Sequence, residues 1–327
     1  MVEIFELDTG KLRDFLGLLK LRGSCNTEIE TIVYSNFKYY GGFIAYVDNQ
    51  PAGCIGYVIK RLAYDSNKEI LWFNDWFVAE TYRGLDIGKK LLQKVATKSG
   101  LSCGIISPLQ SRKVGLKSGF SIAERIMECR FPLNPYKVGY KKYFRGNFYS
   151  DSLIKRVVRA WKFKILSSFR RDDVSNCSFK KGPIDINLNI VKDLPTGFWH
   201  DNNFLLFVIS VLESQKKNEL DLWTIQHADF WSMGFTFLLR NKIKESVVLY
   251  TRILNGATNF SVYSSIINTL KINNEADQIN ILLDSYNVKK FKLNKCFIKE
   301  LPFFVFGDNF KSVEFIQHLD KDSSWRF

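Results

Sequence analysis

The most informative stretch of the sequence is Phe73-Asn-Asp-Trp-Phe-Val-Ala-Glu-Thr-Tyr-Arg-Gly-Leu-Asp-Ile-Gly-Lys-Lys-Leu-Leu92. Its apolar start predicts a buried strand over Ile70–Val78, and its end predicts a helix that opens at Ile87, with a tight polar turn between them. From Arg83 to Gly88 the turn follows the pattern Arg-Gly-x-x-x-Gly. Several backbone amides can point the same way there, and free N–H groups beside a helix N-terminus favour an anion. The junction therefore predicts a site for a pyrophosphate group.

The elements that follow make this prediction more specific. A short apolar strand is predicted over Cys103–Ser107 and a short helix over Ser111–Lys117, followed by Ser118-Gly-Phe120. A pair of strands over Ile122–Glu128 and Cys129–Leu133 completes the order. The sequence thus reads strand, phosphate loop, helix, strand, helix, Gly-Phe, strand.

This order resembles the Gcn5-related N-acetyltransferase (GNAT) superfamily over roughly residues 1–134. In that family the turn Gln/Arg-x-x-Gly-x-Gly/Ala binds the coenzyme A pyrophosphate, and here it stands as Arg83-Gly84-Leu85-Asp86-Ile87-Gly88. The resemblance implies an α/β (α+β) fold with a mixed, mostly antiparallel sheet flanked by helices. It also implies an acyl-coenzyme A cosubstrate and no metal. The residues implied to bind the coenzyme are Phe77, Val78, Arg83, Gly84, Asp86, Ile87, Gly88 and Lys89.

Two positions depart from the family pattern. Asp86 stands where the family usually has its first glycine; an aspartate tolerates left-handed backbone geometry and could cap the helix that starts at Ile87. Its charge would weaken pyrophosphate binding unless the side chain turns inward to that cap. Gly115, five residues before Phe120, stands where many relatives carry a tyrosine proposed to protonate the departing thiolate. Either another group supplies that proton or the thiolate leaves unassisted.

The resemblance also implies two catalytic positions, Val78 and Asp75. In the family, a backbone amide at the position of Val78 hydrogen-bonds the thioester carbonyl and would stabilise the oxyanion as an amine attacks. Asp75 is the candidate general base, acting directly or through one water; anchoring a loop or a neighbouring strand is the alternative. Regular alternation would put Asp75 on the face opposite Asn74 and Trp76, where a buried carboxylate needs a partner.

The second half of the chain repeats part of this order. Strands are predicted over Trp231–Leu239 and Ser246–Leu254, and a helix and a strand follow over Asn259–Lys271 and Gln278–Leu283. One or two more strands are predicted over Phe297–Phe306. This resembles the second half of another acetyltransferase-like fold, so we expect tandem domains. The junction Leu254-Asn-Gly-Ala-Thr258 lacks the phosphate motif, so the second copy is not expected to bind coenzyme A.

The predicted division is 1–135 for the acyl-coenzyme A domain, 136–195 for a basic helical linker and 196–327 for the degenerate copy. From Lys137 to Arg171 the chain has eleven Lys and Arg residues and one acid, against a net charge of +14 for the whole chain. An apolar stripe follows helical spacing there, at Ile154, Val158, Trp161 and Ile165. Such a helix fits packing on the core, attraction of a phosphorylated ligand, or contact with an anionic membrane or nucleic acid. No recognition fold accompanies it, which argues against nucleic acid.

Composition favours a cytoplasmic protein. The chain is 46% hydrophobic and 24% charged, which is usual for soluble domains. The longest apolar run, Phe204–Leu212, is too short to span a bilayer, and no signal pattern opens the sequence. Six scattered cysteines and three separated histidines predict neither disulfides nor a metal site. His200 and His227 lie near aromatic residues and could touch an acceptor, although a structural role explains both more simply.

The tandem arrangement also resembles the two-domain N-acyltransferases of bacterial surface-polysaccharide pathways, such as O-antigen biosynthesis. These enzymes move an acetyl or 3-hydroxybutanoyl group from coenzyme A to the amine of a nucleotide-linked aminodeoxysugar. The resemblance implies a dTDP-linked amino sugar as the acceptor, and a homo-oligomer is left open. The alternatives are acetylation of a protein, peptide or small amine, and a catalytically inactive adaptor with the same fold.

Overall fold

The computed structural model describes residues 1–23, 26–62, 65–106, 108–134, 176–184, 198–199, 202–215, 220–239, 242–254, 257–273, 275–284 and 297–307. The predicted basic helix with its apolar stripe and His200 lie outside these residues. Within the described part, no helix is long and apolar enough to cross a membrane.

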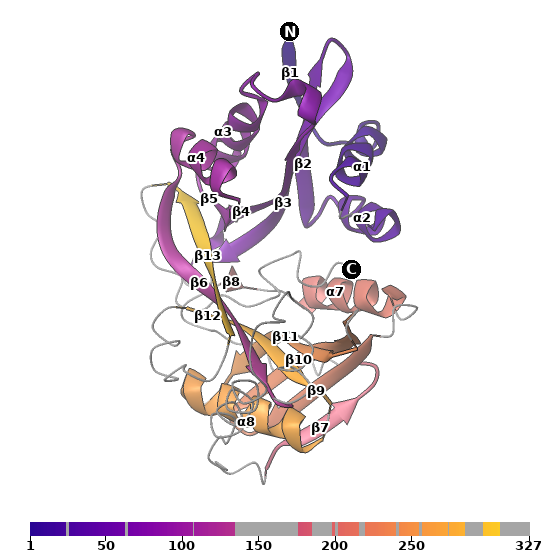
Figure 1. The fold of residues 1–327 in the computed structure, drawn as a ribbon, viewed down its shortest axis with the longest axis vertical. Coiled ribbons are helices and arrows are strands. Elements are labelled where there is room, and N and C mark those ends of the chain that lie inside the picture. The colour runs from indigo at the N-terminus through magenta and orange to yellow at the C-terminus, as the bar shows by residue number, and fades with distance from the viewer. Residues whose placement is uncertain are drawn as a thin grey trace, which may run out of the picture.

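One 13-stranded sheet runs through both halves of the chain (Figure 1). Its order is β1-β2-β3-β4-β5-β13-β6-β12-β11-β10-β9-β7, and β8 pairs with β3. The strands are β1 Val2–Glu6, β2 Tyr40–Val47, β3 Gln50–Leu62, β4 Asp65–Val78, β5 Ser102–Ile105, β6 Ser121–Pro132, β7 Ser178–Lys181, β8 Phe198–Trp199, β9 Asp221–His227, β10 Phe230–Leu238, β11 Lys244–Ile253, β12 Gln278–Asp284 and β13 Phe297–Phe306.

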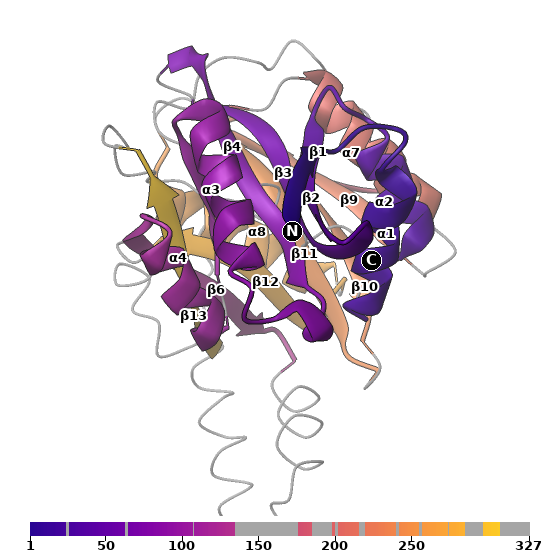
Figure 2. The ribbon, with the colours of Figure 1, turned by 90° about the horizontal axis from the view of Figure 1, so that it is seen from above.

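Helices cover both faces of this sheet (Figures 1 and 2). One face carries α1 Leu12–Leu21, α2 Thr27–Tyr34 and α7 Asn202–Ser214, and the other carries α3 Ile87–Ser99, α4 Leu109–Lys117 and α8 Asn259–Ile272. The apolar side chains of α1, α2 and α7 belong to one core cluster that joins the two halves. Those of α3 and α8 form two separate clusters on the opposite face.

Two parallel strand pairs reveal the internal repeat. Strands β4 and β5 are parallel and flank α3, while β11 and β12 are parallel and flank α8. Every other pairing in the described sheet is antiparallel. Because a parallel pair needs a crossover connection, each strand–helix–strand unit marks one copy. The predicted fold class, a tandem of mostly antiparallel sheets flanked by helices, is confirmed.

The strand order next to β5 differs from the prediction. Residues 121–132 form one long strand, β6, where the sequence predicted a pair of strands. The predicted break at Glu128 carries no Gly, Pro or Asn, so nothing turns the chain there. The neighbour of β6 is instead β13, which pairs with β6 on one side and with β5 on the other. The C-terminal strand thus completes the sheet of the N-terminal half.

Strand β7 lies inside the range predicted to be linker. It pairs with β9 through contacts such as Phe179 with Ile225 and forms the last strand of the sheet order. The division at residues 135 and 195 stays a prediction.

Candidate functional site

A bulge in β4 shapes the predicted catalytic strand. Asn74 pairs with Gly56 and Phe77 pairs with Cys54, so two residues of β4 lie opposite one residue of β3. The first of these two, Asp75, has a left-handed backbone with φ 46°. Such an extra residue bends a strand and shifts its side chains to new faces.

The bulge overturns the predicted alternation of β4. The side chains of Asn74 and Asp75 both reach the hydroxyl of Tyr34 on α2, so they share the face covered by α1 and α2. Trp76 packs with the core cluster under α3, on the opposite face. Regular alternation failed because the bulge puts two successive side chains on one side.

The Asp75 carboxylate is buried, with 8% of the residue exposed. Tyr34 donates a hydrogen bond from Oη to Asp75 Oδ2 at 2.6 Å, and Arg22 Nη2 lies 2.7 Å from Asp75 Oδ1. A buried carboxylate requires such partners because burial otherwise disfavours its charge. The sequence predicted the need for a partner but not which residues supply it: Arg22 directly follows α1, and Tyr34 is the last residue of α2.

Strand β4 separates from β5 after Trp72, before the bulge. In the described part of the chain the two strands pair at Leu71 with Ser102 and at Trp72 with Cys103. On the other side, the Ala79 N–H bonds to the Ala52 carbonyl at 2.9 Å, so β3 stays attached. Since successive amides of a strand point to opposite edges, the N–H of Val78 points away from β3. It faces the edge from which β5 has diverged.

The loop between β4 and α3 contains two left-handed residues. Gly84 has φ 95°, and Asp86, the residue before the helix, has φ 55° and ψ 17°. Asp86 adopts the left-handed geometry that the sequence analysis expected an aspartate to tolerate. The predicted helix cap is wrong, because the Asp86 side chain makes no hydrogen bond to α3. An N-cap residue normally has extended dihedrals, which left-handed geometry does not provide. Of the side chains that the structure describes, none caps the first-turn amides of α3.

The remaining loop residues leave the helix terminus basic and accessible. Arg83 is exposed and lies 3.1 Å from Glu80, an exposed pair of small energetic weight. Ile87 is buried and anchors the start of α3, whereas Lys89 stays half-buried beside it. The first turn of α3 carries no acid. These features suit an anionic group.

Trp76 and Gly88 form the wall behind this terminus. A Cβ at Gly88 would lie 3.1 Å from Trp76 Cζ2, closer than an ordinary contact, so a side chain there would require the indole to shift. The indole Nε1 is buried and has no hydrogen-bond partner. An orphaned donor next to uncapped helix amides fits a ligand rich in acceptor oxygens, such as a pyrophosphate. Trp76 was not among the predicted coenzyme-binding residues.

The side chain of Phe304, on β13, lies beside Gly115, the position at which many relatives carry a tyrosine. Gly115 is buried, and a Cβ there would lie 2.8 Å from Ile106 Cδ1 and 3.1 Å from the ring of Phe304 on β13. A larger side chain at residue 115 would therefore require the side chains of Ile106 and Phe304 to move.

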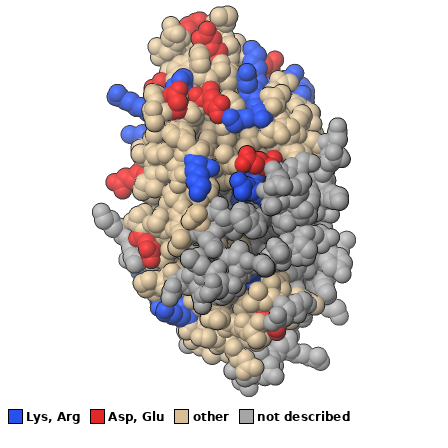
Figure 3. All heavy atoms as spheres, turned by 180° about the vertical axis from the view of Figure 1, so that it is seen from behind, with Lys and Arg blue, Asp and Glu red and all other residues tan. Residues whose placement is uncertain are grey.

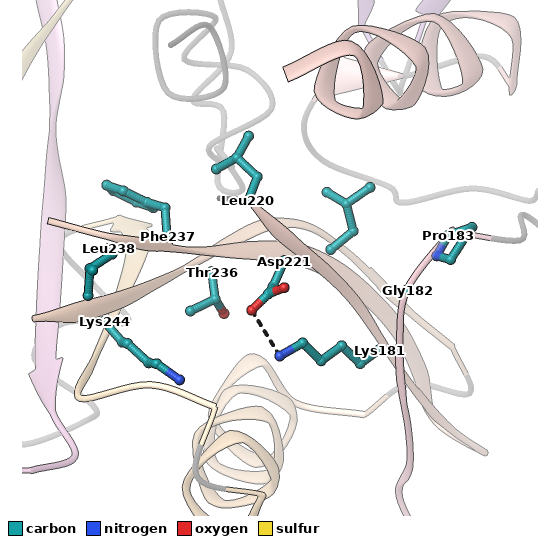
Figure 4. Close-up of a pocket in the computed structure, with 10 residues that line it drawn as sticks. Lys181, Gly182, Pro183, Leu220, Asp221, Thr236, Phe237, Leu238 and Lys244 are labelled. Atoms are coloured by element: carbon teal, nitrogen blue, oxygen red, sulfur yellow. Dashed lines mark ion pairs between the residues drawn. The ribbon is translucent and has the colours of Figure 1, made fainter. Parts of the chain in front are cut away.

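A separate hollow of about 560 Å³ lies in the second half of the chain (Figure 4). Its polar side includes Lys181, which lies 2.9 Å from Asp221 and 3.2 Å from Glu275; the hydrogen bond to Asp221 is the main cause of the raised pKa of Lys181. The described residues that line it are Lys181, Gly182, Pro183, Leu220, Asp221, Leu222, Thr236, Phe237, Leu238 and Lys244. No predicted site residue lines this pocket.

Other candidate groups are not brought to the β4–α3 junction. His227 accepts a hydrogen bond from the Asp229 N–H at 3.2 Å and stacks on Phe230, which is a structural role. Among the residues that the structure describes, no group of His, Cys, Asp and Glu could hold a metal ion.

Comparison with known proteins agrees with this geometry. The family described as acetyltransferase (GNAT) domain matches residues 38–120, from β2 to the end of α4. A GCN5-related N-acetyltransferase from Anabaena variabilis ATCC 29413 has a TM-score of 0.60 at 8% identity, over 93% of this chain and 72% of that chain. A probable N-acyltransferase from Enterococcus faecalis V583 has a TM-score of 0.55 at 7% identity, over 93% and 72%.

A third structure shares the tandem arrangement. The tandem GNAT protein from the clavulanic acid biosynthesis pathway has a TM-score of 0.51 at 8% identity, over 93% of this chain and 98% of that chain. No curated protein matches the sequence. At these identities the structures establish the fold alone. The family match over residues 38–120 supports an acyl-coenzyme A-dependent transferase.

Proposed function

We propose that this chain transfers an acyl group, acetyl or 3-hydroxybutanoyl, from coenzyme A to the amine of a dTDP-linked aminodeoxysugar. The observation that carries the transfer is the open edge of β4 beside an uncapped α3. Bound acyl-coenzyme A supplies the thioester, and Phe77, Val78 and residues 83–89 hold it. The first-turn amides of α3, with Arg83 and Lys89, bind its pyrophosphate.

The residues of β4 perform the chemistry in this proposal. The Val78 N–H donates to the carbonyl oxygen and stabilises the negative charge that develops there. Asp75 takes the proton of the attacking amine, directly or through one water, while Arg22 and Tyr34 fix its carboxylate. The C–N bond forms as the C–S bond breaks. The departing thiolate takes its proton from water, because Gly115 offers no acid.

Two observations support a small anionic acceptor. The net charge of +14 attracts polyanionic ligands such as a nucleotide diphosphate. On the face shown in Figure 3, Lys and Arg are interspersed with Asp and Glu over the described part. That face therefore has no broad basic surface that would suit nucleic acid. The fold is also that of a tandem GNAT protein from a small-molecule biosynthetic pathway.

The test is thiol release from acetyl- and 3-hydroxybutanoyl-coenzyme A, with and without a panel of dTDP-aminodeoxysugars. Release that requires one sugar supports the proposal and identifies both substrates. Release with peptides, polyamines or other amines alone would replace the acceptor but keep the reaction. The features that favour an inactive adaptor are Asp86 and Gly115, and an intact protein that fails to bind coenzyme A would support that alternative.

A further inference from the structure

A buried tyrosine is wedged into the bulge of β4. Tyr34 is fully buried, and its ring packs against Phe15 with centroids 4.7 Å apart and against Tyr40 at 6.0 Å. Its hydroxyl lies 2.6 Å from Asp75 Oδ2 and 3.1 Å from Asn74 Oδ1. The phenol therefore contacts both Asp75, the first residue of the bulge, and Asn74, the residue before it, from a helix that the sequence did not predict.

A glycine on the neighbouring strand makes room for this hydroxyl. Gly56 pairs with Asn74, and a Cβ at Gly56 would lie only 1.9 Å from Tyr34 Oη and 2.7 Å from Asn74 Oδ1. No side chain can occupy residue 56 while the phenol stays in place. A glycine inside a strand often marks such a close approach. Tyr34 and Gly56 are thus complementary in shape.

The bulge needs an external support. Asp75 adopts φ 46°, a left-handed conformation that is uncommon for non-glycine residues, although aspartate tolerates it better than most, so contacts with its side chain help to hold it. After the bulge, β4 pairs with β3 again at Phe77 with Cys54 and at Val78 with Gly53, and the Ala79 N–H bonds to the Ala52 carbonyl. The extra residue of the bulge sets this register, and the register decides to which edge the Val78 amide points.

We infer that Tyr34, seated at Gly56, is a positioning residue that fixes the β4 bulge and aims both the Asp75 carboxylate and the Val78 amide. Tyr34 is fully buried, so it acts through these groups and does not touch substrate. This inference rests on the proposed function for the roles of Asp75 and Val78. The contacts that lock the bulge do not depend on it.

The test compares Tyr34→Phe with a matched control, Tyr57→Phe. Tyr57 is also buried and donates its hydroxyl to a carboxylate, that of Glu6 at 3.3 Å. Its backbone pairs with Phe73, next to the bulge, but its side chain lies under α3, on the face opposite Tyr34. Hydrogen exchange of the segment 73–79 in the ligand-free protein is measured first. Exchange at least tenfold faster in Tyr34→Phe than in Tyr57→Phe is expected, and equal exchange would overturn the lock.

A spectroscopic readout then tests the aim of the Val78 amide. With acetyl-coenzyme A labelled with carbon-13 at the thioester carbonyl, the bound carbonyl stretch should rise toward the free value in Tyr34→Phe. It should stay at the parental value in Tyr57→Phe. In turnover, Tyr34→Phe should lower kcat at least tenfold with KM for the coenzyme within twofold. An unchanged stretch and an unchanged kcat would overturn the positioning role.

A second variant separates folding from positioning. Gly56→Ala should displace the phenol and reproduce the fast exchange of Tyr34→Phe, and the double variant should exchange no faster than Gly56→Ala. If the two substitutions instead multiplied each other's effect on the exchange rate, Tyr34 and Gly56 would not act through the same contact. If the unmodified protein releases no thiol with any amine, the proposed function fails. The hydrogen-exchange comparison would still show whether Tyr34 holds the β4 bulge.

Discussion

The two strand–helix junctions of this protein have the same topology but opposite chemistry at the helix N-terminus. At the first, β4 passes through a loop with two left-handed residues to α3, whose first turn receives no side-chain cap. At the second, β11 leads to α8, where extended Thr258 accepts a hydrogen bond from the Ser261 N–H at 3.3 Å. The first-turn amides of α3 are left for a ligand, whereas one first-turn amide of α8 bonds to the Thr258 side chain.

This difference shows how one copy of a repeated unit keeps an anion site and the other loses it. Free amides and the helix dipole create the site, and a capping hydroxyl consumes a donor of the same kind. Strand geometry diverges in parallel: the left-handed Asp75 of β4 has no counterpart on β11, whose described residues all have negative φ. Strand β11 has a bulge of its own, because Tyr250 pairs with Met233 and Val248 pairs with Gly234, which leaves Leu249 as an extra residue. The helix cap and the left-handed residue therefore distinguish the two junctions.

The largest expected effect is on turnover, from Asp75→Asn. If Asp75 is the base, kcat should fall by a factor of about 10² to 10⁴, since general-base catalysis typically contributes that much. Affinity for acetyl-coenzyme A should stay within about twofold. Glu245→Gln removes another buried carboxylate, on β11, and should leave kcat unchanged. Steady-state kinetics and calorimetric binding measure both, and turnover of Asp75→Asn within a few-fold of the parent would remove Asp75 from this role.

The next largest effect is on coenzyme binding, from Gly88→Leu. Its side chain would collide with Trp76 and cover the first-turn amides, so acetyl-coenzyme A should bind about 100-fold more weakly, or about 2.8 kcal/mol. Ser261→Leu makes the equivalent change in the first turn of α8 and should not alter affinity. Calorimetric titration compares the two. An equal loss of coenzyme affinity in both variants, or a loss only in Ser261→Leu, would contradict a coenzyme site at the first junction.

A smaller effect is expected on stability, from Thr258→Ala. Loss of the cap should lower the free energy of unfolding by about 1 kcal/mol, because one donor of α8 loses its acceptor. Denaturant unfolding measures this loss, and coenzyme affinity serves as the internal control. A variant as stable as the parent would show that the observed cap carries no weight.

The smallest effect is a gain, from Asp86→Gly. Glycine adopts φ 55° without strain, and the change removes a negative charge next to the proposed pyrophosphate. Acetyl-coenzyme A should bind roughly threefold more tightly at low salt, a gain that salt diminishes. Asp86→Ala removes the charge but keeps the strain, so it should show less of the gain. Weaker binding in Asp86→Gly would mean that the carboxylate helps to hold the ligand.

Much of the first junction could be predicted from the sequence because its signals are local. The start of α3 at Ile87 and the end of β4 at Val78 were predicted at the observed residues, from apolar periodicity and a polar turn. Gly56 also carried a signal, since an isolated glycine in a strand indicates a bulge or a close approach.

The parts that were missed depend on contacts distant in the sequence. Nothing near Asp75 reveals that Arg22 and Tyr34 hold it, because both come from the preceding helices. Strand β13 was predicted over its observed range, yet its place between β5 and β6 depends on pairing with residues far earlier in the chain. Such pairing cannot be read from periodicity.

Hydrogen exchange with and without saturating acetyl-coenzyme A tests the contrast between the two junctions most directly. If only the first junction binds the coenzyme, protection should appear in the segment 76–91 and be absent from 257–264. Protection of the α8 terminus, or of neither terminus despite measured binding, would contradict the account.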